Sequence, residues 1–254
     1  MNKIISQSWA ISLRDLRKKL KWWKYLLSLI FLFVIIYFIG AGIDSFFNFS
    51  QYNTLNLKYS EFFSIAILLY LSALSCFISG IELVSGKKGF LKFLLVVPIS
   101  KFTILFGKTI ATIINFILSY FVIIILFLFI FNRFSFVTLF LLFLLFVYLI
   151  FVFQALGIWI SSYFKKYETA RRFSSYLALL MLFFSGILFP LDYFGKSIML
   201  IYYLNPLTYF IDLARYISFN LGSLNLYLDL LVVLVFGIIS IILGTIYYNK
   251  RIRN

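Results

Sequence analysis

Residues 134–164 read FSFVTLFLLFLLFVYLIFVFQALGIWISSYF, a run that contains no Asp, Glu, Lys or Arg. A helix rises 1.5 Å per residue, so about 20 apolar residues cross the ~30 Å hydrocarbon core of a bilayer. This run is longer than that requirement, and it predicts a helix that spans a membrane.

The composition of the whole chain agrees with that prediction. Of its 254 residues 64% are hydrophobic and only 12% are charged, whereas soluble domains are near half apolar and a quarter charged. The chain has no histidine and one cysteine, Cys76. These counts exclude a disulfide within the chain and any histidine-based metal or acid–base site.

Further charge-free runs predict more spans. Together with 134–164 they are residues 25–43, 62–81, 109–132, 173–191 and 230–249. A seventh apolar stretch, 197–211, contains Pro206 and would reach only about 22 Å as a helix, so it is too short to cross. We therefore expect an all-α integral membrane protein with six transmembrane helices.

The positive charges predict the orientation. With the N-terminus inside, the inner segments hold 19 of the 23 Lys and Arg residues, as the positive-inside rule requires. Both termini are then cytoplasmic. The basic residues lie between apolar runs and form no basic face, so we expect no nucleic-acid partner.

Residues 1–21 precede the first span and form the first of two basic segments on the cytoplasmic side. Their apolar side chains recur at helical spacing on one face: Ile5, Trp9, Leu13, Leu16 and Leu20. The pattern favours an amphipathic helix on the inner membrane surface; the alternative is a solvated basic tail.

The second segment, residues 86–102, reads GKKGFLKFLLVVPISKF and joins two spans. Residues 88–97 can form about three helical turns that end before Pro98, because the residue preceding a proline avoids the helical region. The apolar side of this helix would lie in the membrane interface or in a partner's groove. The alternative is that its lysines only set the orientation.

Motifs for independent chemistry are missing from the sequence. Gly107-Lys108-Thr109 looks like the end of a phosphate-binding loop, but residue 102 is Phe where that loop needs glycine. The eight acidic residues form no close pair for hydrolysis. The span centres carry no charge, and their polar exceptions are Asn115 and Gln154, which disfavours an ion-coupled transporter.

Two motifs carry a family resemblance. The first is Glu82 near the end of the second span, followed by Gly89, Leu91, Leu94, Leu95, Pro98-Ile99-Ser100 and Gly107-Lys108. The second is Ser185-Gly186 with Pro190, then Asn205-Pro206-Leu207-Thr208-Tyr209, Asp212 and Arg215. With six spans, the chain resembles the permease subunits of ABC-2-type exporters over essentially its whole length.

The resemblance implies one permease domain over residues 1–254, in which residues 1–21 are an interfacial helix. Residues 86–101 would be the cytoplasmic coupling loop, and residues 190–215 an outer re-entrant hairpin between helices five and six. The implied contacts of the ATPase subunit are Glu82, Lys87, Lys88, Leu91, Lys92, Leu94, Leu95 and Pro98. The hairpin residues are Pro190, Asn205, Pro206, Asp212 and Arg215, and the last two are spaced to pair on one helical face.

The function implied by the resemblance is export by a transporter subunit in the cell membrane. A separate cytoplasmic ATPase would bind ATP and Mg, and this chain would bind no cofactor, have no catalytic residue and pair with a copy of itself or a second permease. The cargo would be hydrophobic or amphipathic: a drug, lipid, peptide or glycan. One alternative is a membrane-embedded immunity or scaffold protein that moves nothing, and another is a secondary transporter.

Overall fold

In the computed structural model the described residues are 59–85, 135–164, 166–188 and 196–253, with short pieces at 6–7, 9–13, 34, 38, 42, 103, 107, 109–114 and 117. The elements in these ranges are all helices. They are α3 (Tyr59–Ser85), α6 (Phe136–Ser161), α7 (Tyr167–Phe183), α8 (Lys196–Leu204), α9 (Pro206–Phe219) and α10 (Leu226–Arg253).

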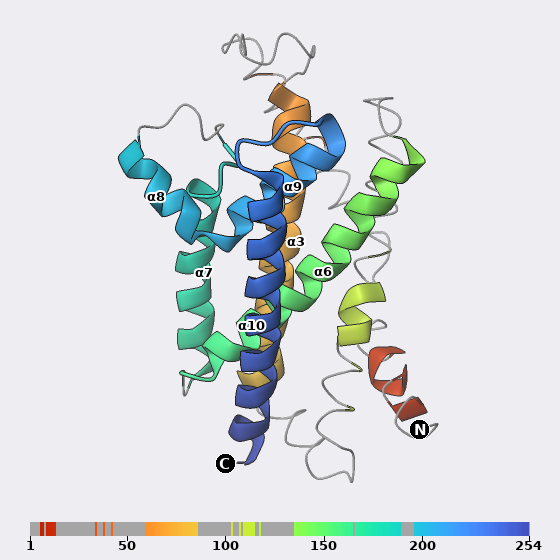
Figure 1. Cartoon of the computed structure of the whole chain (residues 1–254). Coiled ribbons are helices and arrows are strands. Elements are labelled where there is room, and N and C mark those ends of the chain that lie inside the picture. The colour runs from red at the N-terminus through yellow and green to blue at the C-terminus, as the bar shows by residue number, and fades with distance from the viewer. Residues whose placement is uncertain are drawn as a thin grey trace.

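Three of these helices, α3, α6 and α10, are long and apolar enough to cross a membrane. They correspond to the predicted spans 62–81, 134–164 and 230–249. In Figure 1 all three run toward the end of the molecule where the chain finishes, while α7 runs in the opposite direction. The predicted spans 25–43 and 109–132 lie mostly outside the described residues.

Helix α7 differs from the predicted fifth span, residues 173–191. It begins at Tyr167 and ends at Phe183, after 17 residues, or about 26 Å. The chain turns at residues 184–186, and Gly186 adopts a positive φ of 72°. Helix α7 thus contains the start of the predicted span, but the prediction was wrong at the other end. It counted charge-free residues, and the turn at Ser185-Gly186 carries no charge.

Helices α3 and α6 form the centre of the fold and approach each other backbone to backbone. A Cβ atom on Gly80 would clash with the backbone oxygen of Gln154, and one on Gly157 would clash with that of Phe77. Small residues of this kind let membrane helices approach closely.

The opposite side of α6 packs on α10. The Tyr148 hydroxyl group donates to the carbonyl oxygens of Val233 and Leu234, each at 3.2 Å. It occupies the space that a side chain at Gly237 would need. The outward faces of both helices carry exposed apolar residues such as Leu144 and Ile238, as expected for helices surrounded by lipid.

The described part of the predicted interfacial helix is short. Residues 9–13 are helical, and Trp9 and Leu13 are 50% and 38% exposed while Ile11 is buried. The apolar face predicted from Trp9 and Leu13 is therefore open to the surroundings. In Figure 1 this piece lies toward the same end of the molecule as the end of α10.

Candidate functional site

The residues of interest fall into two groups, one where α3 ends and one around α9. We name them the inner group and the outer group, and their ends of the molecule the inner and outer end, after the topology predicted from the sequence. The residues of the predicted coupling loop lie outside the described part of the chain: Lys87, Lys88, Leu91, Lys92, Leu94, Leu95 and Pro98, as does Pro190 of the hairpin. The structure describes Glu82 of the inner group and four members of the outer group.

Glu82 lies in the last turn of α3, at the entrance to the predicted coupling loop, and its side chain is exposed. The hydroxyl group of Tyr167, the first residue of α7, donates to its Oε1 at 3.4 Å. Burial raises the pKa of the Tyr167 hydroxyl and the Glu82 carboxylate raises it further, while Arg171 lowers it. The hydroxyl thus keeps its proton, and it joins the end of α3 to the start of α7.

Tyr167 was missed by the sequence reasoning, which considered only charges on the inner side. The feature that could have pointed to Tyr167 is its position directly after two lysines, Lys165 and Lys166, before a charge-free run. The pairing with Glu82 spans 85 positions in sequence, and no local pattern encodes a contact at that separation.

Helix α8 ends at Leu204 and α9 begins at Pro206, within the apolar stretch that we expected to be too short to cross. Asn205 is the N-cap of α9, with its Oδ1 accepting from the Leu207 backbone N–H at 3.1 Å, and Pro206 occupies the first turn. Asparagine is among the best N-caps, and proline is favoured at the first helical position because its missing N–H is not needed there.

Side chains from two elements, α9 with its N-cap and α3, donate to the backbone carbonyl groups at and just beyond the end of α7. The last carbonyl groups of a helix require such partners. Asn205 Nδ2 donates to Phe184 O at 2.7 Å and also to Met181 O at 3.1 Å. Thr208 Oγ1 donates to Phe184 O at 3.3 Å. The Tyr59 hydroxyl group, at the start of α3, donates to Leu188 O at 2.6 Å. The end of α7 is therefore tied to α9 and to α3.

Arg215 completes this set of contacts. It is 3% exposed, its Nη2 donates to Gly186 O at 2.8 Å, and its guanidinium group lies over the Phe62 ring. A buried guanidinium group above an aromatic face gains both a cation–π contact and a charge-assisted hydrogen bond.

Asp212 and Arg215, which we expected to be able to pair, use separate partners. The Asp212 carboxylate accepts from the backbone N–H groups of Ser223 and Leu224, both at 2.9 Å. Arg215 is directed toward α3 and the end of α7, as described above. Three-residue spacing places both side chains on α9 without fixing their partners, and here the loop that follows α9 provides closer donors.

The buried carboxyl group of Asp229 was not singled out from the sequence. It lies in the first turn of α10 and is 2% exposed. An acidic residue is common at the N-terminus of a helix, so the sequence gives no signal that this one is buried.

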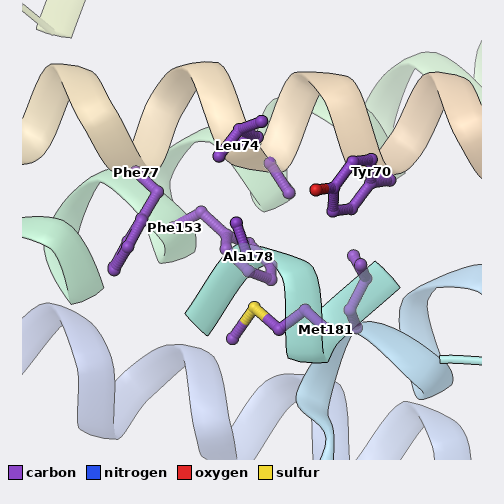
Figure 2. Close-up of a pocket in the computed structure, with 8 residues that line it drawn as sticks. Tyr70, Leu74, Phe77, Phe153, Ala178 and Met181 are labelled. Atoms are coloured by element: carbon purple, nitrogen blue, oxygen red, sulfur yellow. The ribbon is translucent and has the colours of Figure 1, made fainter. Parts of the chain in front are cut away.

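A small cavity of about 10 Å³ lies between α3, α6, α7 and α9. Figure 2 shows its lining, which is apolar apart from the hydroxyl group of Tyr70. The labelled residues are Tyr70, Leu74, Phe77, Phe153, Ala178 and Met181. This volume is about that of one water molecule, so it is a packing gap beside α7 and too small for a ligand. Nor do the described residues contain a group of three or more Cys, Asp or Glu side chains that could hold a metal ion.

Comparison with known protein families shows which family the chain matches. The family model described as ABC-2 type transporter matches residues 6–219. A search of the curated proteins found no match to the chain. The matched range contains both the Glu82 contact at the inner end and the contacts of α9 at the outer end.

Proposed function

The chain belongs to the ABC-2 type transporter family, and we propose that it is the transmembrane permease subunit of an ATP-driven exporter in the cell membrane. The observation that carries this proposal is the family match over residues 6–219, which includes every described helix except α10. The chain is thus a component of a membrane transporter. In our proposal it has no ATPase site of its own.

In the proposed arrangement the chain crosses the membrane six times and keeps both termini in the cytoplasm. The three candidate spans α3, α6 and α10 support it, as does the excess of Lys and Arg on the predicted inner side. Residues 190–215 would form a re-entrant outer hairpin, since α8 has only 9 residues and α9 only 14, too few to cross the bilayer.

A separate ATPase subunit would bind ATP and Mg and would dimerise in the cytoplasm. Its movement would enter this chain through the interfacial helix, residues 1–21, and the coupling loop, residues 86–101. Glu82 is three residues from the end of α3 and accepts a hydrogen bond from Tyr167 of α7. A displacement of the loop would therefore move both α3 and α7, which run in opposite directions.

The same movement would be passed to the outer end by α7. The carbonyl group of Phe184, its C-cap residue, accepts from Asn205 and Thr208, and that of Gly186, just beyond its end, accepts from Arg215. Two permease chains, identical or different, would enclose the path. The cargo would be hydrophobic or amphipathic, as drugs, lipids, peptides and some glycan carriers are.

The test is to tag the chain, purify it gently from its own membranes and identify the co-purifying proteins by mass spectrometry. We expect a nucleotide-binding subunit, which a variant with both Leu94→Asp and Leu95→Asp loses. The matched control is Phe136→Asp with Val137→Asp, which places the same two charges on exposed residues at the other end of a span, where the helix N-terminus favours them.

Recovery of the ATPase with the control but not with the loop variant would support the coupling role. If no ATPase is recovered while two permease chains stay together, the exporter proposal fails. The alternative, an immunity or scaffold protein of the same fold, would then account for the chain.

A further inference from the structure

Three aromatic side chains join the end of α6 to α10 at the inner end of the molecule. Trp159 lies in the last turn of α6, Tyr163 in the turn that follows it, and Tyr247 on α10. The Trp159 and Tyr163 rings meet edge to face with 6.3 Å between their centroids, and the Tyr163 and Tyr247 rings lie 5.6 Å apart. We call these three residues the aromatic bridge.

The hydrogen bonds of the aromatic bridge have one direction. The indole Nε1–H of Trp159 donates to the Tyr163 hydroxyl oxygen at 3.2 Å, and an indole nitrogen can only donate. The Tyr163 hydroxyl group in turn donates to the Tyr247 hydroxyl oxygen at 3.4 Å, which is long for such a bond. The Tyr247 hydroxyl group keeps its own hydrogen, and it has no acceptor among the described residues. The row of donors therefore ends in a hydrogen that needs an acceptor from outside the bridge.

The aromatic bridge lies at the depth of the lipid headgroups. Tyr247 is the last residue of the candidate span in α10, Leu226–Tyr247, and the side chain of Tyr163 is 62% exposed. Trp and Tyr are enriched at this depth because their rings are apolar while their polar groups reach the headgroups. The strong acceptors at this depth are the phosphate oxygens of the lipids, and hydrogen bonds to such charged acceptors are the stronger kind.

The sequence around the aromatic bridge is basic. Residues 248–253, directly after Tyr247, read YNKRIR, and Asp and Glu are absent from residues 230–254. Residues 165–172, close behind Tyr163, contain one acid, Glu168, against Lys165, Lys166, Arg171 and Arg172. Clusters of Lys and Arg beside a span attract anionic lipids. The charge of both segments therefore favours an anionic headgroup over a zwitterionic one.

The outward face of α10 offers a surface for the acyl chains of such a lipid. Ile239, Ile242 and Ile246 recur at a spacing of three and four residues, which places them on one face of the helix. About half of each side chain is exposed. They occupy the turns that lead from Tyr247 toward the middle of the span, which is the direction an acyl chain takes from its headgroup.

We infer that the aromatic bridge is the binding site of one anionic lipid on the inner side of the membrane. The Tyr247 hydroxyl group donates to a phosphate oxygen of the headgroup, and Trp159 and Tyr163 orient that hydroxyl group. The basic segments 165–172 and 248–253 favour the negative charge, and the acyl chains lie along Ile242 and Ile246. The bound lipid thus joins the end of α6 to α10. This site needs no ATPase subunit, so its test is independent of the proposed function.

Native mass spectrometry of the full-length chain, in detergent micelles with added lipid, counts the lipid molecules that stay bound. Phosphatidylglycerol is the anionic probe, and phosphatidylcholine with the same acyl chains is the zwitterionic one. We expect the wild type to bind its first phosphatidylglycerol about tenfold more tightly than phosphatidylcholine, because basic segments attract anionic headgroups. Since a ligand of the folded state stabilises it, phosphatidylglycerol should also raise the unfolding midpoint more than phosphatidylcholine does.

Tyr247→Phe is the decisive variant, because it keeps the ring and removes the last donor. It should bind phosphatidylglycerol about tenfold more weakly than the wild type, as expected for the loss of one hydrogen bond to a charged group. Tyr163→Phe interrupts the row of donors and should weaken binding as well. Tyr227→Phe is the matched control, since it removes a hydroxyl group from an 80% exposed tyrosine at the other end of the same helix, and it should bind like the wild type.

The lipid preference of the wild type tests the inference even if a variant does not fold. Equal affinity of the wild type for the two lipids overturns it, and so does wild-type affinity in Tyr247→Phe. Displacement of the lipid by inorganic phosphate would mean a site for free phosphate instead. A loss of chain dimers in Tyr247→Phe with unchanged lipid binding would assign the bridge to a contact between two copies of the chain, and the lipid site would then be wrong.

Discussion

The guanidinium carbon of Arg215 lies 3.4 Å from the centroid of the Phe62 ring, and this contact joins α9 to the first turn of α3. The same guanidinium group donates to Gly186 O beyond the end of α7. One side chain thus connects three elements that are separate in sequence. It fixes the position of α9 relative to α3 and to the turn after α7.

Replacing Arg215 should therefore destabilise the outer end more than replacing Phe62. Arg215→Ala leaves the Gly186 carbonyl group without its donor, which costs about 1–3 kcal/mol for a buried group. Phe62→Leu removes only the aromatic face and should cost about 0.5–2 kcal/mol through that contact. Thermal unfolding of the purified chain measures both, and Phe136→Leu, at an 84% exposed position, is the control. Equal midpoints for Arg215→Ala and wild type would contradict the role of this residue.

Asn205 has two functions that substitutions can separate. Asn205→Asp keeps an oxygen for the Leu207 N–H but loses the donor to Met181 O and Phe184 O. Asn205→Ala loses both, and loss of the cap alone costs about 0.5–2 kcal/mol. We expect unfolding midpoints in the order wild type, then Asp, then Ala. An Asp variant as stable as wild type would show that the cap alone matters and that the contact with α7 adds nothing.

The crossing of α3 and α6 should tolerate no side chain. Gly80→Ala and Gly157→Ala each force a Cβ atom onto the backbone of the facing helix, and overpacking costs about 1–3 kcal/mol or more. Gly42→Ala is the matched control, because nothing lies within 4 Å of a Cβ atom there. We expect both crossing variants to lower the yield of folded protein and the unfolding midpoint. If Gly80→Ala behaves like Gly42→Ala, the backbones of α3 and α6 are not in contact at this residue.

Local chemistry explains which features of the fold the sequence predicted. The spans α3, α6 and α10 follow from composition, and the break before α9 follows from an N-cap and a proline, Asn205 and Pro206. Each of these signals is read within one segment. The end of α7 was missed because the turn at Ser185-Gly186 receives its side-chain donor from a distant element, Arg215 of α9.

The site residues also divide into features that the sequence predicts locally and partners that only the fold determines. Glu82, Asp212 and Arg215 were singled out from motifs, but their partners are distant in sequence. Arg215 reaches 29 positions back to Gly186, and Tyr167 reaches 85 positions back to Glu82. Charge complementarity suggested that Asp212 would pair with Arg215, whereas the fold gives it the backbone N–H groups of Ser223 and Leu224. Such pairings depend on how helices pack, which periodicity and charge do not specify.

The contact between Tyr167 and Glu82 can be tested with the complex that contains the ATPase. If Tyr167 acts by positioning Glu82, Tyr167→Phe and Glu82→Ala should change the ATP hydrolysis rate of the co-purified complex in the same direction. Loss of one hydrogen bond of about 0.5–1.5 kcal/mol corresponds to about a two- to tenfold change. Because the two residues act through one contact, the double variant should add little to the stronger single variant.

Glu168→Gln, which changes an exposed acid beside Tyr167, is the control for charge alone. A wild-type rate in Tyr167→Phe together with an altered rate in Glu82→Ala would exclude Tyr167 from coupling, and additive effects would mean that the two residues act independently.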